Sequence, residues 1–185
     1  MAELGDTNDP RALIPGDTAA LHDVADSLGS YGEVLHQAGA GLRRIDTSAG
    51  WSGQAAEQFR SVFHGQPGKW LTAGDAFHAA RTAVQDYTSS LAWAQGQASD
   101  AIAQWNEAQA ATAQATTQHA QAVTQAQRQA EATSVAGTPA TPVNIPFTDP
   151  GEAKREAARQ TLNRARSQLA SAGDTRRDGG RQSTR

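Results

Sequence analysis

The side chains that could carry chemistry are five histidines and a scatter of carboxylates. His22 and Asp26 lie one helical turn apart and could share a metal ion, but two solvent-facing polar residues on an acidic helix explain this pair better. His64 and His78 flank a Gly-Gln-Pro-Gly break, and neither has a Cys or a second His at ligand spacing. We therefore expect no metal ion and no cofactor.

Motifs that would indicate catalysis are missing from the sequence. It contains no Gly-rich phosphate loop, no His-Glu-x-x-His and no nucleophile elbow. The absence of Cys excludes disulfides and thiolate chemistry. A narrow helical protein also offers no pocket that would desolvate a pair of carboxylates. The sequence predicts that this chain is not an enzyme.

Composition and charge limit the class of protein further. Only 38% of the 185 residues are hydrophobic and 5% are aromatic, which is lean for a compact globule but enough for long helices with a narrow buried stripe. Residues 151–185 carry nine Lys and Arg against four Asp and Glu, whereas residues 1–150 are acidic. A solvated tail is favoured over a nucleic-acid-binding arm, because the tail has no interleaved aromatics for base stacking.

Two heptad patterns predict the elements that position these side chains. After Asp17, a good N-cap, apolar residues recur at alternating spacings of three and four, and a second such register starts at Trp70. The first stripe consists of Leu21, Val24, Leu28, Tyr31, Leu35, Ala38, Leu42 and Ile45. Glycines weaken the first helix but let a partner backbone approach closely; they are Gly29, Gly32, Gly39 and Gly41. The predicted fold is all-α: an elongated antiparallel helical hairpin with a long second helix.

The C-terminal third predicts one more helix. Asp149-Pro150-Gly151-Glu152 is a helix start, Gly173 is a suitable C-cap, and small residues between them form a stripe. We expect this helix to fold back on the Ala-rich part of the long helix. The predicted organisation is an N-terminal arm (1–16), a hairpin (17–135) bent at 46–53, a Pro-rich linker (136–150), a C-terminal helix (151–173) and a disordered basic tail (174–185).

The sequence predicts neither a Sec-type signal peptide nor a membrane-spanning helix. The acidic start, Met1 to Asp6, is not followed by an apolar run, so it does not read as a Sec-type signal peptide. No stretch of about 18 apolar residues occurs, so no membrane span is expected.

The tripeptide Trp51-Ser52-Gly53 stands at the predicted bend. A Gly frees the backbone for unusual angles, and a Trp offers a wide apolar face with one N–H donor. By itself the tripeptide favours an ordinary turn with a buried Trp. Its position between two heptad helices, with Phe59 and Phe63 following on one helical face, weakens that interpretation.

In this setting the chain resembles the Trp-X-Gly superfamily, the helical hairpins exported by type VII secretion systems. Further residues look like the signal domain that opens many actinobacterial polymorphic toxins: Leu4-Gly5-Asp6-Thr7, Asp9-Pro10, Leu13-Ile14-Pro15-Gly16, Trp70-Leu71, Trp93-Ala94 and Trp105. The resemblance covers about residues 3–172. It implies that the chain routes a cargo, usually a C-terminal toxin domain, to the secretion machinery.

The resemblance also implies partners and a location. Its members are secreted without a Sec signal and are cytoplasmic before export, and they pair with a second helical hairpin, either a partner protein or another copy. The implied recognition residues are Trp51, Gly53, Phe59, Phe63 and Trp70. The expected partners exclude nucleic acid.

This sequence departs from the family pattern at one element, an aromatic residue followed four positions later by an acid. Tyr87 is followed there by Leu91, and Trp105 by Gln109. Either a partner chain supplies this element or the subfamily uses another signal. The sequence ends at Arg185 without a toxin domain, so it is expected to be either a fragment of a longer toxin or an orphan module. The alternative function is a structural coiled-coil scaffold unrelated to secretion.

Overall fold

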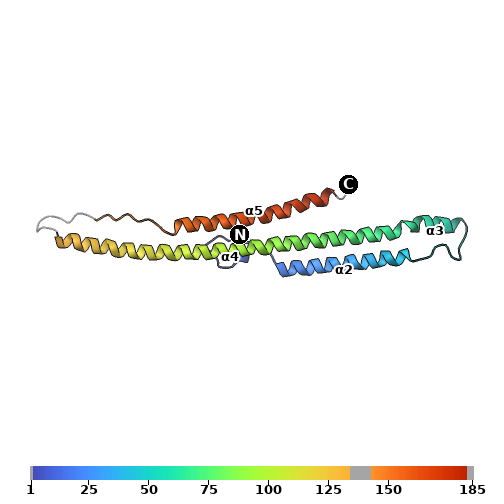
Figure 1. Cartoon of the computed structure of the whole chain (residues 1–185), viewed down its shortest axis with the longest axis horizontal. Coiled ribbons are helices and arrows are strands. Elements are labelled where there is room, and N and C mark those ends of the chain that lie inside the picture. The colour runs from blue at the N-terminus through green and yellow to red at the C-terminus, as the bar shows by residue number, and fades with distance from the viewer. Residues whose placement is uncertain (1, 134–142, 183–185) are drawn as a thin grey trace. The chain divides into compact units, whose positions relative to one another are not determined.

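The computed structural model describes residues 2–133 and 143–182, and the side chains of residues 2–133 and 143–174 (Figure 1). Its helices are α1 (Pro10–Leu13), α2 (Thr18–Arg43), α3 (Gln54–His64), α4 (Gln66–Thr133) and α5 (Glu152–Gln182). Within the described ranges no strand occurs beyond an isolated bridge between Leu4 and Thr7. The all-α prediction is confirmed: the long helix α4 packs against α2 along one stretch and against α5 along another.

Contacts divide the chain into two units, which are described separately. The first unit consists of Met1–Pro15 with Trp93–Ala170. The second unit consists of Gly16–Ala92 with Ser171–Arg185. Helix α4 contributes its first part to the second unit and the rest to the first.

The second unit contains the helical hairpin. Asp17 caps α2 as predicted, since its carboxylate accepts hydrogen bonds from the backbone N–H groups of Ala19 (2.9 Å) and Ala20 (3.2 Å). The chain leaves α2 after Arg43, reverses direction through a loop that ends at Gly53, and continues into α3. Helix α2 and the first part of α4 consequently lie side by side and antiparallel (Figure 1).

Glycines bring these two helices together backbone to backbone. A Cβ atom added at Gly32 would lie 3.1 Å from the carbonyl oxygen of Gly74, and one added at Gly74 would lie 3.0 Å from the carbonyl oxygen of Gly32. A Cβ atom at Gly39 would similarly lie 3.1 Å from the carbonyl oxygen of Pro67. Such distances are tighter than most Cβ contacts in proteins, so a larger residue would require the neighbouring backbone to shift, whereas glycine permits this approach without a shift.

The close approach changes which face of α2 is buried. The buried residues of α2 are Ala25, Gly29, Gly32 and Gly39. Val24, Tyr31 and Ile45 of the predicted stripe are instead 48%, 63% and 53% exposed. The other stripe residues are partly buried: Leu21, Leu28, Leu35, Ala38 and Leu42. The predicted stripe is therefore covered only in part, because the fully buried contact is made by the glycine face, which lets the backbones approach more closely than large side chains would.

In the first unit, small residues join α4 and α5. Ala94, Ala98, Ala101 and Ala108 of α4 are fully buried. On α5, Ala158, Leu162 and Ala165 are at most 1% exposed. This is the small-residue stripe that the sequence predicts, and the predicted folding back of the C-terminal helix onto α4 is confirmed. The predicted location on the Ala-rich part of α4 is wrong, because α5 starts beside Thr112 and its contacts with α4 lie at or before that residue. The Ala-rich surface lets the two helices approach closely with little apolar volume.

The more distal part of α4 is contacted by extended chain instead of by α5. His119 Nε2 lies 2.8 Å from the carbonyl oxygen of Ile145, and its ring meets Phe147 edge-on at 5.3 Å between centroids. The hydrogen bonds that link α5 and its start to α4 involve Glu107 and Thr112, nearer the middle of the long helix.

The N-terminal arm folds onto the same unit. It contains the short helix α1, and the side chains of Leu13 and Ile14 are buried. Arg166 of α5 holds both ends of the arm, because its guanidinium donates to the carbonyl oxygens of Ala2 (2.9 Å) and Leu13 (3.3 Å) and pairs with the Glu3 carboxylate (3.1 Å). The arm is therefore an integral part of this unit.

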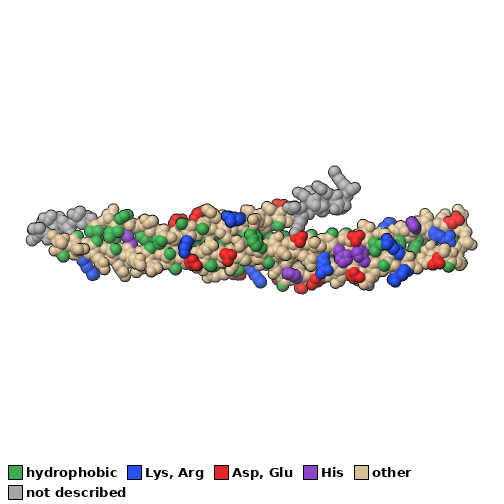
Figure 2. Space-filling model, viewed as in Figure 1, with side chains coloured by type: hydrophobic (Ala, Val, Ile, Leu, Met, Phe, Trp, Pro, Cys, Tyr) green, Lys and Arg blue, Asp and Glu red, His purple; other side chains and the backbone are tan. Residues whose placement is uncertain are grey.

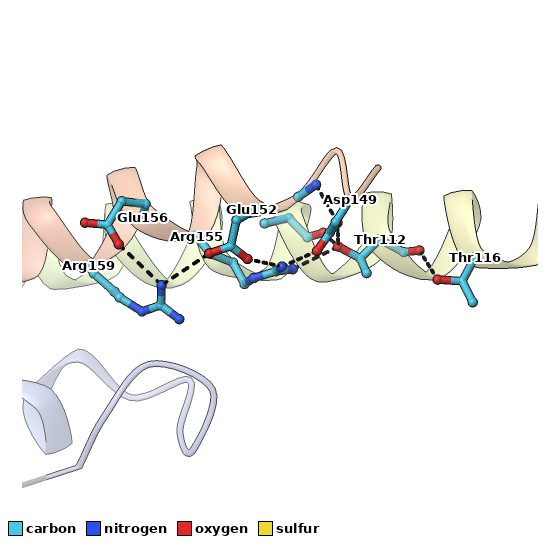
Figure 3. A network of polar contacts seen from close by, with 9 residues as sticks. Thr112, Thr116, Asp149, Glu152, Arg155, Glu156 and Arg159 are labelled. Carbon is cyan, nitrogen blue, oxygen red and sulfur yellow. Dashed lines mark hydrogen bonds and ion pairs between the residues drawn. The ribbon is translucent and has the colours of Figure 1, made fainter. Parts of the chain in front are cut away.

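A polar network fixes the start of α5 on α4 (Figure 3). The Asp149 carboxylate accepts hydrogen bonds from the hydroxyl of Thr112 (2.6 Å) and the N–H of Gly151 (2.8 Å), and it pairs with the guanidinium of Arg155. Arg155 also donates to Thr112 (2.8 Å) and to Glu152 (2.6 Å). The sequence predicts Asp149 as a helix cap; its tie to Thr112 on another helix depends on tertiary structure.

This network makes the stability of the first unit dependent on pH. The hydrogen bond from Thr112, followed by those from Arg155 and Gly151, lowers the pKa of Asp149 to about 2. Because folding keeps this carboxylate ionised below its ordinary pKa, its contribution is complete above about pH 4 and is lost as the pH falls toward 2.

Replacing Asp149 by Asn is therefore expected to lower the unfolding midpoint at neutral pH and to have a shrinking effect between about pH 4 and pH 2. Thermal unfolding followed by circular dichroism across this range measures the difference from the wild type. Asp100→Asn, which changes an exposed carboxylate of the same unit, is the control. A difference that stays constant down to pH 2 would contradict the role assigned to Asp149.

Helix α5 continues beyond the end that the sequence predicts. Gly173, the predicted C-cap, lies within α5, which extends to Gln182. The predicted linker and tail fall partly outside the described residues, at 134–142 and 183–185. The domain boundaries therefore stay predictions. No helix among the described residues is long and apolar enough to cross a membrane.

Candidate functional site

The predicted recognition residues cluster where α2 and α3 are joined. Trp51 lies in the loop between these helices, and Gly53 immediately precedes α3. Phe59 and Phe63 lie one helical turn apart on α3, so they face the same side. Four of the five residues thus come from a single short segment of the second unit.

Three aromatic side chains form a continuous row. The ring centroids of Trp51 and Phe59 are 5.4 Å apart, and those of Phe59 and Phe63 are 5.3 Å apart in a stacked arrangement. Trp51 is 47% exposed and Phe59 is 44% exposed. An ordinary turn would bury its Trp, whereas this aromatic row presents an apolar surface to solvent. Exposed aromatic surface of this kind is typical of sites that bind another protein.

Gly53 allows the chain to enter α3. Its φ of +100° and ψ of 175° lie outside the regions that other residues adopt without strain. A Cβ atom added there would meet no atom within 4 Å. The glycine is therefore required by backbone conformation, and the space beside it remains accessible.

Trp70 lies apart from this row. It is 43% exposed and belongs to the first turns of α4. Ring contacts connect Trp51, Phe59 and Phe63, and none of the ring contacts found among the described residues involves Trp70. The structure therefore brings together three of the predicted aromatic residues and leaves the fourth separate.

Arg60 holds the loop that carries Trp51, a role that sequence reasoning missed. Its guanidinium donates one hydrogen bond to the carbonyl oxygen of Thr47 (2.8 Å) and another to that of Trp51 (2.5 Å). Hydrogen bonds from Ser48, with a smaller contribution from Arg60, lower the pKa of Asp46 in the same loop. Arg60 thereby positions Trp51 through its backbone. A basic residue in the second turn of a helix after the bend was the available signal, but its acceptors are carbonyl oxygens that no sequence pattern displays.

Four of the five histidines have structural partners: His22, His36, His78 and His119. His22 Nδ1 lies 2.6 Å from the carbonyl oxygen of Thr18 in its own helix. His36 Nε2 lies 2.9 Å from a carboxylate oxygen of Asp75, and its ring is 5.1 Å from that of His78. In the part of the chain that the structure describes, no three His, Asp or Glu side chains are grouped so that they could hold a metal ion.

The described structure is thus a helical module with an exposed row of aromatic side chains. Residues 2–183 match the family model described as "Putative T7SS secretion signal domain", where T7SS is the type VII secretion system. The chain therefore belongs to this family of secretion signal domains, and the resemblance seen in its sequence is confirmed. No curated protein and no solved structure matched the chain.

Proposed function

We propose that this chain routes a cargo to the type VII secretion machinery and that the cargo is a toxin domain. The family match over residues 2–183 is the observation that carries this proposal. The exposed aromatic row supports it, because a domain that acts as a signal must present a surface to the machine that reads it.

The recognition surface in this proposal consists of Trp51, Gly53, Phe59, Phe63 and Trp70. Trp51 supplies a large, rigid side chain of the kind that dominates binding energy at protein interfaces. Phe59 and Phe63 extend its apolar surface along α3. Gly53 sets the angle at which the loop meets α3. Trp70 is a secondary contact, since it lies outside the row.

The proposed pairing partner is another helical hairpin, encoded separately or provided by a second copy. The apolar residues of α2 that the glycine contact leaves exposed support this proposal: Val24, Tyr31 and Val34 are 48%, 63% and 62% exposed. Tyr31 also contacts Phe77 of α4 at 5.9 Å between centroids, so the exposed apolar surface spans both helices of the hairpin. A second hairpin packing there would bury the heptad stripe that α4 covers only in part.

The proposal assigns no intrinsic catalysis to the chain and places it outside the cell after export, without a Sec signal. Its acidic carboxylates and histidines are spread along helices or engaged in structural contacts such as those of His22, His36 and His119. The family description supports a signalling role, and it supports export as the outcome.

Export of a fused reporter tests this function. The full chain, joined at its C-terminus to a reporter enzyme, would be expressed in a host with an active type VII system and in an otherwise identical strain lacking that system. We expect reporter activity in the medium of the first strain only. Equal activity in both media, or retention in both, would overturn the proposal.

The alternative function is a coiled-coil scaffold unrelated to secretion. The exposed apolar residues of α2 favour this alternative, because a coiled-coil scaffold would bury them against another helix. Light scattering on the purified chain separates the two functions, because a scaffold would form open-ended assemblies that grow with concentration, whereas a signal domain would form a closed complex of fixed size.

A further inference from the structure

A groove of about 600 Å³ opens beside the aromatic row, within the second unit. It forms where the end of α2, the following loop, α3 and the start of α4 meet. Its volume is within the range of binding sites for ligands and short segments. The residues that line it are Leu42, Arg43, Ile45, Thr47, Arg60, Phe63, His64, Gly65, Pro67 and Gly68.

The lining combines an apolar floor with basic groups. Leu42, Ile45 and Phe63 supply the apolar side chains, and Phe63 also belongs to the aromatic row. Arg43 and Arg60 supply permanent positive charge, and no Asp or Glu is among the lining residues. The groove is therefore suited to an apolar side chain that has a negative charge near it.

Arg60 is held in a position to bind a carboxylate. Its two hydrogen bonds to loop carbonyl oxygens fix the side chain, which is only partly exposed. A guanidinium has five N–H donors, so these two bonds leave it able to bind a further acceptor. An arginine fixed in advance loses less conformational freedom when it binds a carboxylate.

The charge of the second unit is segregated toward this groove. The segment from Arg43 to Lys69 contains four of the five Lys and Arg residues of 16–92, but only two of its eight Asp and Glu residues. Before Arg43, helix α2 contains three Asp or Glu residues and no Lys or Arg. In Figure 2, the end of the hairpin where α3 lies shows basic side chains together with acidic ones.

We propose that this groove binds an acidic segment of a partner protein, anchored by one apolar side chain. The proposal rests on the secretion function proposed above and names the chemistry of the partner at that same end of the hairpin. The apolar anchor would enter between Ile45 and Phe63, and a neighbouring carboxylate would pair with Arg43 or Arg60.

A short protein segment fits this surface better than a membrane does. An anionic membrane is broad, and it would also face the acidic side chains Asp23, Asp26 and Glu33 of α2. A segment that enters the groove meets the basic groups without meeting those acids. Concave shape with local positive charge therefore favours a peptide ligand.

Selection from a library of short random peptides displayed on phage tests the inference with the full chain as bait. We expect the enriched peptides to combine Asp or Glu with an aromatic or aliphatic residue. Fluorescence anisotropy of one enriched peptide should then show affinity that falls with salt and that falls at least about tenfold for Arg43→Glu. Arg44→Glu, an exposed neighbour outside the groove, is the matched control and should bind nearly as the wild type does.

Several outcomes would overturn the inference. They are enrichment of basic peptides, absence of any enrichment, or equal binding by Arg43→Glu and the wild type. Binding to phosphatidylcholine vesicles containing phosphatidylglycerol, abolished by Arg43→Glu without selection of acidic peptides, would assign the groove to membranes instead. Export of the reporter in these cases would show that the secretion function stands while the groove assignment fails.

Discussion

Replacing Gly74 by Ala is expected to destabilise the hairpin unit by about 1–3 kcal/mol, despite the higher helix propensity of Ala. A Cβ atom at this position would overlap the ring of His36 and would lie 3.0 Å from the carbonyl oxygen of Gly32. The first contact displaces a side chain that binds Asp75, and the second is with backbone that cannot move without separating the helices.

Chemical or thermal unfolding followed by circular dichroism measures this loss. For a unit of this size, each kcal/mol corresponds to about 4–8 °C in the unfolding midpoint. Gly41→Ala is the matched control, since Gly41 lies in the same hairpin and a Cβ atom there meets nothing within 4 Å. It should leave the midpoint unchanged or raise it slightly. Equal effects of the two substitutions would show that the helices are not in backbone contact.

The sequence predicts the helices well, but it predicts only in part the face by which α2 packs. Asp17 and Asp149 mark helix starts because a capping side chain bonds to N–H groups nearby in sequence. The heptad stripe through Tyr31 predicts that large apolar side chains make the contact, yet the fully buried residues of α2 are Ala25 and the glycines Gly29, Gly32 and Gly39. The sequence predicts that the glycines allow a close approach, but glycine carries no hydrophobic signal that would show which helix face makes the contact.

The same distinction separates the predicted and missed parts of the site. Trp51 and Phe59 can be predicted because residue type and helical spacing place them on one surface. Arg60 and the groove cannot, since they depend on loop carbonyl oxygens and on segments that meet only after folding. Arg166 is similar, because it joins α5 to backbone at the other end of the chain.

Replacing Trp51 by Ala is expected to reduce export at least about tenfold without unfolding the chain. Trp51 is 47% exposed and its ring contact is with Phe59, so little buried surface is lost from the fold. Truncation of a central Trp at an interface commonly costs 2 kcal/mol or more, which corresponds to a change of more than about tenfold in affinity.

Trp93→Ala is the matched control for this substitution. Trp93 is 43% exposed, nearly as much as Trp51, but it lies on α4 in the other unit. The Trp93→Ala substitution therefore removes the same type of side chain from a comparably exposed position outside the aromatic row. Circular dichroism of both variants establishes that any difference in export does not arise from unfolding.

The central claim is that the secretion machinery recognises the end of the hairpin that carries Trp51. One ratio tests this claim most directly. This is the amount of fused reporter in the medium divided by the amount retained in cells, compared between Trp51→Ala and Trp93→Ala in a secretion-competent host. We predict a ratio at least about tenfold lower for Trp51→Ala, with Trp93→Ala close to the wild type. Equal ratios for the two folded variants would contradict the claim.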